Sequence, residues 1–264
     1  MKLATLNIGG PSVDRAARIL DYLLELGADV LVLTETRPTD GTRLILDAFR
    51  GRGDEVMASL AMSAGERGVA VVTRFGQQLA TDGFVTPDLS HRLVAATLPM
   101  AEPLTVVGAY VPSRDTSPAK ILRKQRFLSQ MTGLANRWAD RRLVFIGDLN
   151  IVGRTHVPRF SAFRAWEYDA LESLQCGGLT DAHTELYPGL QVHSWIGRSG
   201  AGYRYDYAFV SDAIVPDLLD CSYDHGPREL GISDHAAVVL TLDRAAPDVR
   251  GALQPGTGRM LVPA

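Results

Sequence analysis

Several apolar segments of this chain begin or end on side chains that could take part in acid–base or metal chemistry. In order along the chain these side chains are Asn7, Glu35, Asp148 with Asn150, Asp206, and Asp234 with His235. Carboxylate and amide oxygens are the ligands that Mg²⁺ and Mn²⁺ prefer, so a hard cation fits this set better than zinc. The pattern therefore predicts a divalent-metal site.

One such residue alone would mean little, because a strand-terminal Asp or Asn commonly caps a turn or a helix. Their recurrence carries more weight. Strand ends in layered α/β folds converge on one edge of the molecule, where gathered carboxylates repel one another unless a cation or a histidine neutralises them.

The histidine that fits this role is His235. It follows Asp234 at the mouth of an apolar segment, whereas the other histidines are expected to be structural. A carboxylate partner such as Asp206 would hold the ring and favour its charged form. A charged imidazole is suited to hydrogen-bonding a phosphoryl oxygen as negative charge builds there.

The segments that must position these residues are short and rich in Val, Ile and Leu, as buried strands are. We expect strands over 2–8, 29–35, 68–74, 93–98, 104–111, 142–148, 206–211 and 236–242. Helical spacing of apolar residues predicts helices over 12–26, 42–50, 118–137 and 161–175, with Ser12 and Gly27 as caps of the first. These elements together indicate an α/β sandwich.

The bulk properties fit one compact domain over residues 1–243, followed by a Gly- and Pro-rich tail over 244–264 that we expect to be loosely attached. The net charge of -3 excludes a global basic field, although carboxylates of a metal site would lower the charge of a DNA-binding protein too. Two cysteines are too few for a disulfide framework. Without a signal-like or membrane-spanning run, we expect a cytoplasmic monomer.

Seven short motifs, in this order and at this spacing, resemble the endonuclease/exonuclease/phosphatase superfamily. They are Leu6-Asn7-Ile8, Leu33-Thr34-Glu35-Thr36, Gly68-Val69-Ala70, Tyr110-Val111-Pro112, Gly147-Asp148-Leu149-Asn150, Arg204-Tyr205-Asp206-Tyr207 and Ser233-Asp234-His235. The resemblance implies a four-layer α/β sandwich, with two central mixed β-sheets flanked by helices and a metal site at one edge of the sheets.

The same resemblance implies a role for each residue. Glu35 is expected to be the main ligand of Mg²⁺, for which Mn²⁺ could substitute, with Asn7 and Asp234 close to the ion or its waters. Asp148 is expected to orient or deprotonate the attacking water and Asn150 to position the phosphate. Tyr110 is expected to lie near the scissile phosphate. Asp206 and His235 are expected to act as a pair that stabilises the phosphoryl oxygen.

The motifs indicate the type of reaction more clearly than they indicate the substrate. Compact length and the segment 123–127 resemble the exonuclease III-like and abasic-endonuclease branch, which implies a DNA nuclease acting at abasic sites or 3′ ends. Trp195 is expected to line the pocket for the baseless sugar, unless it is a core residue. Arginines of the long insertion would contact phosphates, or else lie scattered on the surface: Arg154, Arg159, Arg164, Arg198 and Arg204.

One departure from the motifs of the repair enzymes favours a different substrate. The repair enzymes of this superfamily have Asn or Asp two residues after the first asparagine, and this chain has Gly9 there. Loss of that polar group leaves room for a different substrate, so a phosphatase or phosphodiesterase for a small or lipid-linked phosphoester stays open. A catalytically silent binding module is disfavoured, because the acidic, amide and histidine set is intact.

Overall fold

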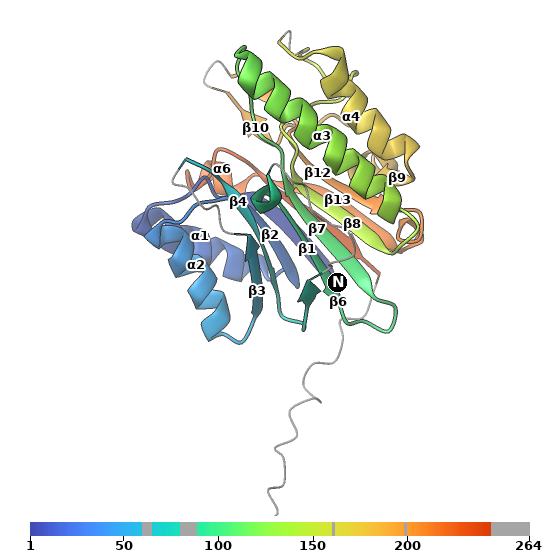
Figure 1. The fold of residues 1–264 in the computed structure, drawn as a ribbon. Helices are drawn as coiled ribbons and strands as arrows, with labels where there is room; N and C mark the ends of the chain where they lie inside the picture. Colours follow the sequence, from blue (N-terminus) through green and yellow to red (C-terminus); the bar gives the residue numbers. More distant parts are fainter. Residues whose placement is uncertain (60–64, 80–88, 160–161, 198–199, 244–264) are drawn as a thin grey trace, which may run out of the picture.

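Two six-stranded mixed sheets stack face to face in the computed structural model, which describes residues 1–59, 65–79, 89–159, 162–197 and 200–243 (Figure 1). The first sheet has the order β13 (Leu218–Asp224), β14 (Ala237–Leu242), β1 (Lys2–Asn7), β2 (Val30–Thr36), β4 (Gly68–Thr73) and β3 (Glu55–Ser59). The second has the order β5 (Gln78–Leu79), β6 (Leu93–Leu98), β7 (Leu104–Tyr110), β8 (Leu143–Asp148), β12 (Asp206–Ser211) and β9 (Leu179–Asp181).

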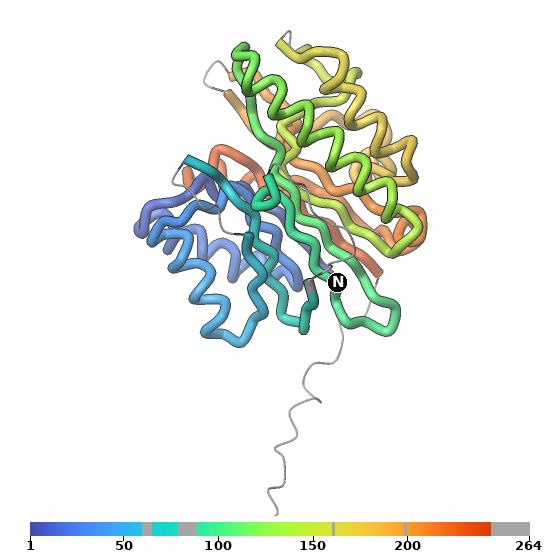
Figure 2. The backbone as a smooth tube through the Cα atoms, in the orientation of Figure 1, coloured from blue at the N-terminus to red at the C-terminus, as the bar shows by residue number. Residues whose placement is uncertain are grey.

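Helices cover the outer face of each sheet. The first sheet packs against α1 (Val13–Leu26) and α2 (Asp40–Gly51), and the second against α3 (Pro118–Trp138) and α4 (Ala165–Cys176) (Figure 2). Three apolar cores result, one between the sheets and one under each helical layer. The expected four-layer sandwich is confirmed.

Short elements complete the described chain. A two-stranded ribbon of β10 (Trp195–Ile196) and β11 (Gly202–Tyr203) lies near the ends of the central strands, and the short helices are α5 (Ala182–Leu186), α6 (Gly226–Glu229), η1 (Ser90–Arg92) and η2 (Val215–Asp217). Within the described residues, no helix combines the length and the apolar character needed to cross a membrane. The predicted tail over 244–264 lies outside the described residues.

Capping residues explain where α1 begins and ends. The Oγ of Ser12 accepts a hydrogen bond from the backbone of Arg15 at the start of α1, and Gly27 ends that helix in the left-handed region with φ 61°. The described strands that the sequence did not predict are β3, β5, β9, β10, β11 and β13. Of these, β3 and β13 form the outer edges of the first sheet. Their side chains are mostly half-exposed, so neither strand has the continuous apolar run of a central strand.

Candidate active site

Strand pairing brings the predicted residues together at one end of the two sheets. In the second sheet β8 lies between β7 and β12, and the register sets Asp148 directly beside Tyr110 on one side and Asp206 on the other. In the first sheet Asn7 ends β1 beside the last residues of β2. The hydroxyl of Ser233 donates to the backbone oxygen of Asn7 at 2.6 Å, which fixes the segment leading to β14 against β1.

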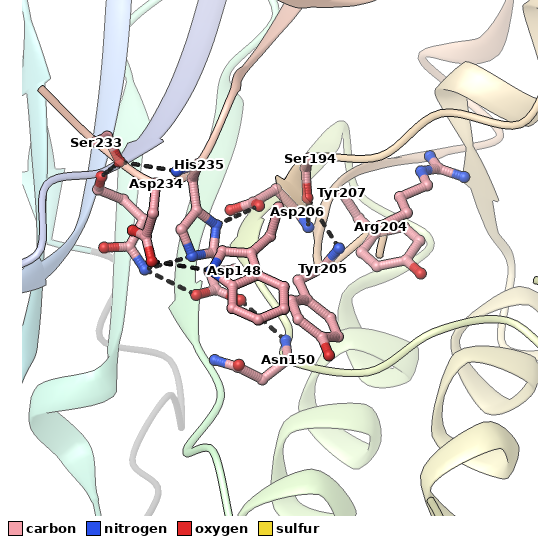
Figure 3. Close-up of polar contacts among 12 residues, drawn as sticks. Asp148, Asn150, Ser194, Arg204, Tyr205, Asp206, Tyr207, Ser233, Asp234 and His235 are labelled. Atoms are coloured by element: carbon pink, nitrogen blue, oxygen red, sulfur yellow. Dashed lines mark hydrogen bonds and ion pairs between the residues drawn. The ribbon is translucent and has the colours of Figure 1, made fainter. Parts of the chain in front are cut away.

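A chain of hydrogen bonds joins the two sheets at this point (Figure 3). Asp206 Oδ2 lies 2.7 Å from Nδ1 of His235, and the Nδ2 amide of Asn7 donates to Asp148 Oδ2 at 2.9 Å. His235 Nε2 lies 3.5 Å from the Asn7 amide, so the far side of the ring faces Asp148 and Asn7. All four side chains are buried, and the arrangement holds a histidine between two carboxylates.

The electrostatics of this group follow from burial and mutual charge. Burial alone lowers the pKa of His235, but the adjacent Asp206 and then Asp148 and Asp234 raise it to about 10, so the ring is charged at neutral pH. Burial and the charge of Asp206 raise the pKa of Asp148, against the lowering effect of His235. Asp148 is therefore a stronger base than an ordinary carboxylate, as a group that takes a proton from water must be.

Two unusual backbone conformations lie at the end of β8. Gly147 has φ 150°, and a Cβ there would lie 2.0 Å from the backbone oxygen of Ala109, so only glycine fits. Asn150 adopts a left-handed φ of 49°, which is uncommon for a residue with a side chain. Its backbone N–H donates to Asp148 Oδ1 at 3.0 Å and its side-chain amide to the oxygen of Val111 at 2.9 Å, so these bonds hold Asn150 at the end of β8.

Glu35 also adopts a left-handed φ, of 56°, where the pairing of β2 with β4 shifts register. Its Oε1 accepts a hydrogen bond of 2.7 Å from the hydroxyl of Tyr110, and its Oε2 lies 3.1 Å from Nε of Arg67. Strained backbone in a residue with a side chain persists only where its surroundings hold it, and it occurs often at functional sites.

The donor set of the first sheet fits a hard cation. Glu35 offers carboxylate oxygens, Asn7 an amide oxygen that otherwise accepts only from the backbone of Gly9, and Asp234 a carboxylate with one oxygen engaged. All are oxygen ligands, as Mg²⁺ requires. Asp148, Asp206 and His235 form a second group, with ligand atoms within 4.8 Å of one another. The charged ring of His235 has no free lone pair, so this group is less suited to a metal ion than the oxygen ligands of the first sheet.

The side chain of Arg15 lies beside Gly9, the position at which the first motif lacks a polar side chain. Gly9 and Gly10 have left-handed φ values of 56° and 50°, and the Arg15 guanidinium donates to the Gly9 oxygen at 2.9 Å and the Ile232 oxygen at 3.3 Å. A Cβ on Gly9 would lie 3.4 Å from that guanidinium. Arg15 thus ties the loop after β1 to the segment that precedes Asp234.

An aromatic cluster, of which Tyr203 and Tyr205 are buried and Trp195 is partly exposed, borders Asp234 and His235. Trp195 Nε1 donates to Asp234 Oδ2 at 2.9 Å, and the Trp195 backbone bridges to that of His235. Its ring lies 5.6 Å from that of Tyr205, which stacks on Tyr203 at 5.6 Å. Trp195 is partly exposed and packs against the buried rings of Tyr203 and Tyr205, and its predicted role in lining a substrate pocket stays a prediction.

The predicted arginines do not gather there. Both terminal nitrogens of Arg204 donate to Asp181, its Nε donates to Tyr223, and the side chain points away from Asp206 (Figure 3). Neighbours on an extended segment face opposite sides, so Tyr205 lies toward Trp195 while Arg204 lies inside. The guanidinium of Arg154 pairs with two carboxylates of α4.

Of the other three, Arg159 and Arg164 are exposed and Arg198 lies outside the described residues. The structure thus gives no support to a phosphate-contacting role for Arg154 or Arg204. Their carboxylate partners, which the sequence does not reveal, already neutralise both guanidinium groups.

Sequence reasoning missed four residues that hold the site. Ser194 Oγ accepts from the backbone N–H groups of Tyr205 and Asp206, and Ser233 ties two strands as described above. Lys124 donates to the Asn150 backbone oxygen at 2.7 Å, and Arg67 contacts Glu35. A lysine on the apolar stripe of a helix was the one available signal, since Lys124 falls between Ile121 and Leu128.

Comparison with known proteins gives consistent matches along nearly the whole chain. A sequence model described as the endonuclease/exonuclease/phosphatase family matches residues 4–235. The exodeoxyribonuclease of Bacillus subtilis (strain 168) is 27% identical over 261 residues, which cover 92% of this chain and 100% of that protein. The DNA repair nuclease APEX1 of Danio rerio is 25% identical over 263 residues, covering 92% of this chain and 82% of that protein.

A solved structure also matches. A 3′ phosphatase, NExo from Neisseria, bound to a product DNA hairpin, has a TM-score of 0.78 at 24% sequence identity, with 92% of this chain and 100% of that chain covered. At this identity the likeness establishes the fold, which agrees with the four layers described above.

Proposed function

Because this chain belongs to the endonuclease/exonuclease/phosphatase family, we propose that it is a Mg²⁺-dependent DNA nuclease of the exonuclease III type. Its substrates would be abasic sites, 3′ termini or both. The observation that carries the proposal is the buried histidine between Asp148 and Asp206, bordered by the partly exposed ring of Trp195. The nuclease names of two relatives that align over 92% of the chain support it, as does the DNA hairpin bound to the Neisseria structure.

In this proposal each buried group has a task that its surroundings favour. Asp148, whose pKa is raised, takes the proton of the attacking water. The side-chain amide of Asn150 donates one N–H to the Val111 oxygen and positions the phosphate with its second N–H. The charged ring of His235 donates from Nε2 to a phosphoryl oxygen, while Asp206 holds its other nitrogen. Tyr110 lies beside both Glu35 and Asp148 and faces the same phosphate.

The metal site in this proposal consists of Glu35, Asn7 and Asp234. Mg²⁺ would supply Lewis acidity to a phosphoryl oxygen and stabilise the leaving oxyanion. Residues 1–243 would form the catalytic domain. A monomeric state and a cytoplasmic location stay predictions.

The test compares substrates directly. The protein is incubated with a duplex that carries one abasic analogue, with Mg²⁺ or with EDTA, beside a panel of phosphomonoesters. We expect incision of the duplex that EDTA abolishes. Hydrolysis confined to the phosphomonoesters would contradict the nuclease and favour the small-substrate alternative.

Two variants test the roles of the buried groups. Asp148→Asn should lower kcat by about 10²–10⁴ through loss of the general base, and His235→Ala by about 10²–10³ through loss of the charged donor. Asp47→Asn is the matched control, because this exposed carboxylate of α2 pairs only with Arg50. A rate near that of the control in either active-site variant, at unchanged melting temperature, would overturn the assignment.

A further inference from the structure

The candidate metal ligand Glu35 is engaged through both of its oxygens by side chains of this chain. Tyr110 donates to Oε1 at 2.7 Å, and Nε of Arg67 lies 3.1 Å from Oε2. The guanidinium also donates from Nη1 to the Tyr110 hydroxyl at 3.3 Å. Glu35, Tyr110 and Arg67 therefore form a closed triangle of polar contacts.

Arg67 is held in place by its neighbours along the chain. Glu66 accepts from Arg92 and Arg123 and contacts the ring nitrogen of His91, which anchors the segment to η1 and α3. On the other side Gly68 begins β4, where a Cβ would lie 2.2 Å from the backbone oxygen of Ser59. The backbone on both sides of Arg67 is fixed, while its side chain stays 31% exposed.

We propose that Arg67 is a positioning residue that competes with the divalent cation for Glu35 and, once displaced, holds the substrate phosphate. The proposal rests on the function proposed above. In the cation-free protein the guanidinium neutralises Glu35 and fixes Tyr110. A cation on Glu35 repels the guanidinium and takes over its carboxylate partner.

The released side chain has one favourable destination. Arginine presents several planar N–H donors and binds phosphate oxygens through two parallel hydrogen bonds. A phosphate that contacts a cation on Glu35 lies beside Tyr110, which Arg67 already contacts. Arg67 would thus lower the affinity for the cation alone and raise the affinity for substrate.

The first test measures cation binding without any substrate. Mn²⁺ is titrated into the full chain and the free ion is followed by electron paramagnetic resonance. Arg67→Met should bind Mn²⁺ about fivefold more tightly than the wild type, as expected for removal of a half-exposed ion pair. Arg43→Met makes the same change in net charge at an exposed pair on α2, and should leave the affinity unchanged.

The second test separates KM from kcat on the abasic duplex. Arg67→Met should raise KM about tenfold, the effect of losing a charge-assisted hydrogen bond to phosphate, with a smaller change in kcat. Arg67→Lys keeps a positive charge near Glu35, so its Mn²⁺ affinity should return toward that of the wild type.

The proposed competition for Glu35 would be disproved if Arg67→Met bound Mn²⁺ no more tightly than Arg43→Met. A lysine variant that binds Mn²⁺ like the methionine variant would also overturn it, because charge would then not be the cause. If no DNA is cleaved by the wild type, the nuclease proposal fails by itself while the Mn²⁺ titration still decides the competition for Glu35.

Discussion

Two lysines of α3, one turn apart, make the same kind of ion pair in opposite surroundings. Lys124 is 1% exposed, donates to the Asn150 oxygen at 2.7 Å and lies 2.9 Å from Glu167 Oε1. Lys120 pairs with Asp115 at 2.7 Å, with both side chains more than half exposed. Replacing each by methionine removes one ammonium and keeps the length of the side chain.

The structure sets the size of each effect. Lys124→Met removes a buried charge-assisted hydrogen bond, which is worth about 1.5–3 kcal/mol. It also removes the ion pair with Glu167, and breaking a buried ion pair costs about 3–5 kcal/mol when the partner charge is left alone. Glu167 is not left alone, because Arg114 also pairs with it. We therefore expect a loss of about 3 kcal/mol, which lowers the Tm by about 6–12 °C in a chain of this size. Lys120→Met should cost less than about 0.5 kcal/mol.

Urea denaturation followed by circular dichroism measures both values. Lys124→Met should also lower kcat, because Asn150 loses the contact that holds its left-handed backbone. The double variant Lys124→Met/Glu167→Gln should lose less stability than the sum of its single variants, since both changes remove one shared interaction. Equal stability of Lys124→Met and Lys120→Met would refute the reasoning, and so would full additivity in the double variant.

Three further outcomes follow from the structure. Ser194→Ala leaves the buried N–H of Asp206 without its acceptor and should cost about 1–3 kcal/mol of stability, with a lower kcat, measured by denaturation and by kinetics. Burial raises the pKa of Glu66, but its arginine partners lower it to about 2. These ion pairs therefore stabilise the folded protein fully above pH 4.5, the usual pKa of the carboxyl group, and their contribution is lost as the pH falls toward 2. The advantage of wild type over Glu66→Gln, about 1 kcal/mol at pH 7 after screening, should therefore shrink by pH 3 in urea titrations. Ellman's reagent should label the exposed Cys176 and spare Cys221, whose buried thiol has a raised pKa, until the protein unfolds.

The central strands and most of the site were predictable because one physical rule governs both. A central strand of a covered sheet is apolar throughout, so a carboxylate or amide at its end stands out in the sequence, as Asn7 and Asp148 do. Edge strands obey no such rule, and β3 and β13 were missed for that reason. His235 was predictable from its place beside Asp234 at the start of a strand, and Asp206, the carboxylate partner predicted for it, lies 2.7 Å from its ring although 29 positions separate the two residues.

The contact of Arg67 with Glu35 was beyond sequence reasoning, because it depends on how β2 pairs with β4. The register shifts between Thr34 and Thr36, so Glu35 is the extra residue of an irregularity in the ladder. Irregularities of this kind re-aim a side chain, and here Glu35 takes a left-handed φ. The hydrophobic periodicity of the sequence does not reveal such a shift in strand register.

Cationic residues show most clearly what the sequence leaves undetermined. Arginines of the long insertion were predicted to face DNA, yet Arg204 is buried against Asp181, while Arg67, Arg92 and Arg123 lie beside Tyr110 or the carboxylate of Glu66. Charge alone does not distinguish a buried pair from a binding surface, because the deciding partner is remote in the sequence. Arg92 and Arg123 already pair with the carboxylate of Glu66, as Arg204 pairs with Asp181, whereas Arg67 keeps 31% of its side chain exposed beside Tyr110. A substrate phosphate that approaches Tyr110 would therefore meet Arg67 on that side.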